Sequence, residues 1–111
     1  MGLLQSVFGN WADNLDGEQA MKLINENRNM IIIDVRAKHE FERGAIARAI
    51  NIPTEELIKK LPELEKYKNR KILVYCGMGT KSKGAMLILR RSGFEHVYNL
   101  KNGMDAYMKK N

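Results

Sequence analysis

The single cysteine of this sequence, Cys76, lies where a reactive thiolate could be built. The apolar, β-rich residues 72–75 precede it, a short glycine-bearing loop follows, and residues 83–91 have a helical pattern. Backbone N–H groups of such a loop can form an anion-binding nest, and a helix N-terminus adds unpaired N–H groups and a partial positive charge. Lys81 adds a full charge. All of these favour S⁻ over SH, so the sequence predicts a lowered pKa for Cys76 and a nucleophile for an anionic substrate.

Each residue of the loop also has a plain structural interpretation. Cys76 could be an inert buried thiol, and the glycines could serve only the turn, although a loop with inward N–H groups needs the same turn. Lys81 could be a solvated charge, but a cation is unfavourable at a helix N-terminus, which favours an anionic partner. For Ser82 we favour a helix N-cap over a contact between its hydroxyl and the sulfur. We predict Cys76 as the nucleophile and the following residues as the substrate-binding loop: Gly77, Met78, Gly79, Thr80, Lys81 and Ser82.

Length and composition predict one globular domain in a reducing compartment, which we take to be the cytoplasm. The chain has 111 residues, 44% of them hydrophobic and 29% charged, and one cysteine cannot form an internal disulfide. The net charge of +6 would attract small anions or an acidic protein. Few aromatic residues and no recognised motif argue against a nucleic-acid partner. No apolar run is long enough to span a bilayer, so we expect no stable membrane insertion.

The order of residue patterns predicts an α/β fold with a small, mostly parallel sheet flanked by helices on both faces. Continuous apolar runs at 30–35 and 72–75 are typical of strands buried on both faces, and shorter strands are predicted at 49–52 and 97–100. Helical patterns alternate with these strands. Asp16 begins a capping box, Thr54 caps a further helix, Pro62 starts another helical piece through Tyr67, and residues 104–110 form the last helix.

The first residues form a separate unit in this interpretation. We assign residues 1–14 to a short N-terminal extension and residues 15–111 to the domain. Apolar side chains of the extension recur at helical spacing, which predicts a short helix docked on the domain. These side chains are Leu3, Leu4, Val7, Phe8 and Trp11.

Two segments of the chain carry ordered motifs that resemble those of the rhodanese family of sulfurtransferases. Asp34-Val35-Arg36, Glu40-Phe41, Gly44-Ala45-Ile46 and Asn51-Ile52-Pro53 are similar to the family's Asp-Val-Arg…Glu-Phe…Gly-His-Ile…Asn-Ile-Pro signature. Cys76-x-x-Gly79-x-Lys81-Ser82, followed by Gly93-Phe94, Val97, Leu100 and Gly103, is similar to its Cys-x-x-Gly-x-Arg-Ser loop and downstream residues. The resemblance implies the rhodanese-like fold and a sulfurtransferase that needs no metal or organic cofactor.

The chain departs from the family pattern at four positions, one of which is Tyr107, near the family's usual tryptophan, where we expect a packing variation. Lys81 replaces the frequent arginine, which keeps the charge but loses a bidentate fork, so a different grip on the substrate is expected. Ala45 stands where the family often has histidine, which argues against a catalytic role there. Asn102 replaces the first glycine of a Gly-Gly pair, which we interpret as a packing variation.

A second polar cluster, Asp34, Arg36 and Glu40, follows the first buried run. A catalytic acid–base pair is conceivable there. We favour a structural network of ion pairs and hydrogen bonds that fixes the loop after the strand, and the resemblance implies the same. His39 and His96 lack companions at metal-ligand spacing, so we predict surface or packing roles and no metal site.

The predicted reaction is transfer of a sulfane sulfur from a small anionic donor such as thiosulfate, through a Cys76 persulfide, to a thiol or an acceptor protein. A phosphatase or arsenate reductase is a weaker alternative, because related loops are one residue longer and end in arginine, whereas four residues separate Cys76 from Lys81. A protein-docking or persulfide-carrier module without significant thiosulfate activity remains the other alternative.

Overall fold

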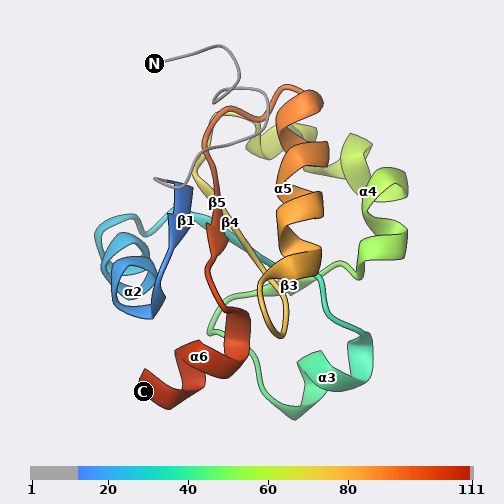
Figure 1. Ribbon diagram of the computed structural model, residues 1–111. Helices are drawn as coiled ribbons and strands as arrows, with labels where there is room; N and C mark the ends of the chain where they lie inside the picture. Colours follow the sequence, from blue (N-terminus) through green and yellow to red (C-terminus); the bar gives the residue numbers. More distant parts are fainter. Residues whose placement is uncertain (1–12, 111) are drawn as a thin grey trace.

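The computed structural model describes residues 13–110 and contains a five-stranded sheet with helices on both faces (Figure 1). Every strand pair is parallel, and the strand order is β1-β5-β4-β2-β3. The predicted α/β fold is therefore confirmed. The strands are β1 (Asn14–Leu15), β2 (Ile31–Asp34), β3 (Ile50–Asn51), β4 (Ile72–Tyr75) and β5 (Val97–Leu100).

The helices form two layers around this sheet. In Figure 1, α2 and α6 lie on one side of the sheet, while α4 and α5 lie on the other. Short 3₁₀ turns, η2 (Thr54–Glu56) and η3 (Glu65–Tyr67), flank α4. The helices are α2 (Gly17–Glu26), α3 (Lys38–Arg43), α4 (Leu57–Leu64), α5 (Thr80–Arg91) and α6 (Gly103–Lys110).

The central strands β2 and β4 supply side chains to both layers because successive residues of a strand point to opposite faces. Ile33 and its partner Val74 pack toward α4 and α5, whereas Ile32 and its partner Leu73 pack toward α2 and α6. All residues of both strands are buried. Burial on two faces explains why their sequences are continuous apolar runs rather than alternating ones.

The parallel register brings the carboxyl ends of the strands to one edge of the sheet. Asp34, the last residue of β2, pairs with Tyr75, the last residue of β4. The segments that follow these strands, and the start of α6 after β5, therefore lie beside one another. This edge is where ligands bind in open parallel sheets, and it holds both polar clusters predicted from the sequence.

Three local details differ from the sequence-based expectations. Thr54 does not cap a helix: it is the first residue of η2, and its hydroxyl donates to Glu55 Oε1 instead of accepting a backbone N–H. Pro62 does not start a new helical piece but lies inside α4, because Leu57, Leu61 and Leu64 form one apolar stripe that packs on the core across the proline. The edge strand β1 was not predicted; it has two residues and pairs with β5 through Asn14 and Leu15. So short a strand carries no recognisable periodicity.

The predicted N-terminal helix lies outside the described residues, and the division into extension and domain stays a prediction. Within residues 13–110, none of the helices combines the length and apolar character needed to cross a bilayer. The predicted cytoplasmic location also stays a prediction.

Candidate active site

The sulfur of Cys76 lies inside a ring of hydrogen-bond donors formed by the loop that follows β4. The backbone N–H groups of Gly79 and Ser82 donate to Sγ, at N···S distances of 3.1 Å and 3.3 Å. The Ser82 hydroxyl oxygen lies 3.2 Å from the same sulfur, and Ser82 lies inside α5, whose N-cap is Gly79. The N-cap role predicted for Ser82 is therefore wrong, because the helix begins two residues earlier, at Thr80. Cys76 is only 4% exposed. The loop thus surrounds one sulfur atom with groups that bind negative charge.

These donors lower the pKa of the Cys76 thiol. Burial raises this pKa, but hydrogen bonds from the Ser82 hydroxyl and from the N–H groups of Ser82, Gly79 and Met78 lower it by more in total. The pKa therefore lies below the ordinary value of 9.0. Because the thiolate is the nucleophilic form of cysteine, the site favours nucleophilic chemistry.

The first turn of α6 orients the loop. The N–H of Met104 donates to the carbonyl oxygen of Cys76 at 2.8 Å, and the N–H of Asp105 donates to that of Gly77 at 3.1 Å. In a planar trans peptide the N–H points away from the C=O. The N–H groups of Gly77 and Met78 therefore point away from α6. The Met78 N–H is among the groups that lower the pKa of Cys76, so α6 helps to orient this donor toward the sulfur.

Two glycines permit the close contact between the cysteine loop and the start of α6. Gly79 has a φ of +91°, and a Cβ there would lie 2.8 Å from the backbone nitrogen of Asn102. Gly103 has a φ of +67°, and a Cβ there would lie 2.6 Å from the carbonyl oxygen of Cys76 and closer still to that of Gly77. Both positions combine a left-handed backbone with a lack of space for any side chain. The sequence predicts Asn102-Gly103 as the turn into the last helix, and the structure adds the contact of Gly103 with the cysteine loop.

A hollow of about 350 Å³ opens beside the sulfur. Its lining carries charges of both signs, two from Arg36 and Lys81 and two from Glu40 and Asp105. Gly79 and Ser82 bind the sulfur but are not among the lining residues. The remaining residues that line the hollow are Cys76, Gly77, Met78 and Thr80.

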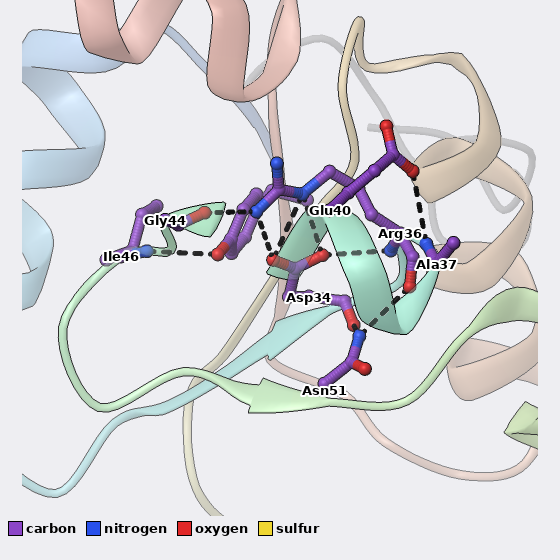
Figure 2. A network of polar contacts seen from close by, with 8 residues as sticks. Asp34, Arg36, Ala37, Glu40, Gly44, Ile46 and Asn51 are labelled. Atoms are coloured by element: carbon purple, nitrogen blue, oxygen red, sulfur yellow. Dashed lines mark hydrogen bonds and ion pairs between the residues drawn. The ribbon is translucent and has the colours of Figure 1, made fainter. Parts of the chain in front are cut away.

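Asp34 and Arg36 form the predicted structural network at the wall of this hollow (Figure 2). The Arg36 Nη2 lies 2.8 Å from Asp34 Oδ2, its Nε donates to both carboxylate oxygens, and its Nη2 also donates to the Gly44 carbonyl at 2.6 Å. Asp34 is fully buried, and the Arg36 side chain is 11% exposed. Glu40 does not join this pair; its Oε1 accepts the Ala37 N–H at the start of α3.

Tyr75 holds the other side of the arginine. The Arg36 guanidinium carbon lies 5.7 Å from the centre of the Tyr75 ring, within cation–π range. The Tyr75 hydroxyl oxygen accepts the Ile46 N–H at 3.0 Å, and burial raises the pKa of this phenol above its ordinary value. The hydrogen bond to Asp34 raises the pKa of Arg36. Arg36 is therefore a fixed, permanently charged part of the wall.

Asn99 and Asn14 lie behind the loop, and the sequence analysis missed both. The Ser82 hydroxyl donates to Asn99 Oδ1, and Asn99 Nδ2 donates to Asn14 Oδ1 at 2.8 Å and to the Gly79 carbonyl at 3.3 Å. Asn99 and Ser82 are fully buried. A polar residue within the apolar run 97–100 was the signal that could have found Asn99.

The described residues include no group of three or more His, Cys, Asp or Glu placed to hold a metal ion. His39 and His96 are exposed, and neither is among the residues that line the hollow. The prediction that the site uses no cofactor stays a prediction.

Family comparison agrees with this geometry. The rhodanese-like domain family matches residues 16–110, which is most of the chain. The chain therefore belongs to the rhodanese-like domain family. The crystal structure of a rhodanese-related protein from Thermoplasma volcanium is similar, with a TM-score of 0.78 and 26% identity, covering 88% of this chain and 92% of that one.

Among curated proteins, the chain is 36% identical over 92 residues to a tRNA uridine(34) hydroxylase of Buchnera aphidicola subsp. Schizaphis graminum, covering 79% of this chain and 30% of that protein. It is 32% identical over 94 residues to the Escherichia coli (strain K12) protein YibN, covering 84% of this chain and 65% of YibN. The chain thus spans less than a third of the hydroxylases that it matches.

Proposed function

We propose that this protein is a sulfurtransferase in which Cys76 carries a sulfane sulfur as a persulfide. The observation that carries the proposal is the ring of donors from Gly79 and Ser82 around a thiol of lowered pKa. A thiolate held in this way is a ready nucleophile, and the adjacent hollow gives a small donor access to it. Membership of the rhodanese-like family supports the same chemistry.

The first half-reaction loads the cysteine. The Cys76 thiolate attacks the outer sulfur of a donor such as thiosulfate, forming a new S–S bond. The S–S bond of the donor breaks, and sulfite leaves with the electron pair. Arg36 and Lys81 on the wall of the hollow attract the dianionic donor, whereas Glu40 and Asp105 oppose it. The transfer involves no net oxidation or reduction.

The second half-reaction unloads the cysteine. The persulfide carries its negative charge on the terminal sulfur, which the inward N–H groups of the loop and Lys81 stabilise. A thiolate acceptor, free or on a protein, attacks that sulfur, and the Cys76 thiolate leaves with the electron pair of the broken S–S bond. The chain has no second cysteine that could resolve the persulfide, so the acceptor comes from outside.

Intact mass spectrometry tests the proposal. The reduced protein is incubated with thiosulfate beside Cys76→Ser. We expect a gain of one sulfur atom in the wild type only, which cyanide removes as thiocyanate. A wild type that gains no sulfur refutes thiosulfate as donor; loading from a protein persulfide would then identify a carrier module, and loading from neither would leave a docking role. Release of phosphate from an aryl phosphate by the wild type would instead support the phosphatase alternative.

A second candidate is action on tRNA as part of a longer protein. The favouring observation is that the curated relatives with the name tRNA uridine(34) hydroxylase match 76–79% of this chain, although the match covers only 26–30% of their own length. The net charge of +6 is compatible with a polyanionic partner. This candidate opposes the earlier expectation of no nucleic-acid partner. A filter-binding titration with tRNA at low and high salt tests it, with binding absent at low salt as the contrary result.

A further inference from the structure

A chain of polar side chains runs from Cys76 to the edge strand of the sheet. The Cys76 sulfur lies 3.2 Å from the Ser82 hydroxyl oxygen, which donates to Asn99 Oδ1 on β5. Asn99 Nδ2 donates in turn to Asn14 Oδ1 on β1 at 2.8 Å. Ser82 and Asn99 are 0% exposed, so water does not compete for these contacts. The few hydrogen atoms of these polar side chains must therefore be shared among the acceptors of the same series.

The orientation of the Asn99 amide follows from its neighbours. The Gly79 carbonyl oxygen, 3.3 Å from Asn99, can only accept a hydrogen bond, so the amide nitrogen must face it. The amide oxygen then faces Ser82. Because this oxygen carries no hydrogen, the Ser82 hydroxyl must be the donor between the two. The fold thereby directs the Ser82 proton toward Asn99.

This direction has a consequence for the sulfur. A serine hydroxyl has one hydrogen, so when it points to Asn99 the Ser82 oxygen offers only lone pairs to Cys76. That arrangement suits a protonated thiol, whose S–H can donate to Ser82. A thiolate has no hydrogen to donate, and the Ser82 hydroxyl can stabilise it only by turning its proton away from Asn99. The fully buried Asn99 oxygen then loses its partner, which is unfavourable.

We propose that Asn99 is a positioning residue that competes with the Cys76 sulfur for the single proton of the Ser82 hydroxyl. In the thiol form the Ser82 hydroxyl donates to Asn99 Oδ1, and in the thiolate form it donates to the sulfur. The competition offsets part of the stabilisation that Ser82 gives the thiolate. A less stabilised thiolate is a stronger nucleophile, since intrinsic nucleophilicity falls with thiol pKa. The proposal concerns ionisation of Cys76 and holds whatever the sulfur donor is.

A double-mutant cycle on the pKa of Cys76 tests the proposal. The pKa is read from the pH dependence of alkylation by iodoacetamide, since the chain has one cysteine. Asn99→Leu frees the Ser82 proton, so we expect the ionisation constant of Cys76 to rise about threefold or more. In a Ser82→Ala background the same substitution is expected to leave the constant unchanged. Equal shifts in both backgrounds, or a fall with Asn99→Leu, would overturn the proposal.

Asn14→Ala is the matched control. It removes the bond from Asn14 to Asn99 but keeps the Gly79 contact that orients the amide. We expect the Cys76 ionisation constant to stay within about twofold of the wild type. A shift as large as that of Asn99→Leu would mean that Asn99 acts through the fold rather than through the Ser82 proton, which contradicts the proposal.

A measurement on the wild type keeps the proposal testable if Asn99→Leu does not fold. At a pH below the pKa of Cys76, the infrared S–H stretching band of the single thiol reports whether its hydrogen is donated. We expect this band at lower frequency in the wild type than in Ser82→Ala, because the thiol donates to the Ser82 oxygen. Bands at the same frequency would refute the predicted direction of the hydrogen bond.

Discussion

Gly103→Ala tests whether the first turn of α6 supports the cysteine loop. Gly103 has a φ of +67°, and left-handed backbone costs a residue with a Cβ about 1–2 kcal/mol. The new methyl group would also meet the carbonyl groups of Cys76 and Gly77, so the hydrogen bonds from Met104 and Asp105 must lengthen. Each is worth about 1 kcal/mol net. Together we expect the free energy of unfolding to fall by about 3–4 kcal/mol.

Urea unfolding measures this change, and Gly84→Ala is the matched control. Gly84 lies within α5 and has no atom within 4 Å of an added Cβ, so alanine there is expected to be neutral or to stabilise by about 0.5–1 kcal/mol. Alkylation of folded Gly103→Ala should also need a higher pH, because the loop donors lose their alignment. A Gly103→Ala protein within about 0.5 kcal/mol of the wild type would refute this account of α6.

Three further predictions concern the charges of the site. The thiol pKa of Cys76 is lower in the folded chain than its unfolded value of about 9.0. The stability of the wild type relative to Cys76→Ala should therefore rise with pH between these two pKa values and be lost as pH falls through the folded pKa. Urea unfolding at a series of pH values checks this. Arg36→Met leaves Asp34 buried without a counter-charge and should lower the free energy of unfolding by about 3 kcal/mol, measured by thermal or urea unfolding. Arg36→Lys keeps the charge and should lower it by less. Equal losses for the two variants would argue that charge is not the cause. Asp105→Asn should raise kcat/KM for thiosulfate about fivefold, and Lys81→Met should lower it similarly, because both charges line the hollow. Measured by thiocyanate formation, both effects should shrink at high salt. Effects that do not depend on salt would indicate packing instead.

The amino-acid sequence by itself determined the class of fold and the lowered pKa of the Cys76 thiol. Burial on two faces requires the continuous apolar runs of β2 and β4, and such runs are visible without a structure. The position of Cys76 between a strand and a helix likewise predicted its lowered pKa, because the donors come from its own loop. Local order along the chain was sufficient for both conclusions.

Contacts between distant segments were decided only by the tertiary structure. Asn99 reaches Ser82 across 17 positions and Asn14 across 85, and nothing in the local pattern pairs these residues. The support of the loop by the first turn of α6 depends on parallel strands ending at one edge, where β4 and β5 deliver their next segments side by side. Local sequence specifies the thiol and the donors that surround it, whereas strand order and register determine which polar groups meet behind them.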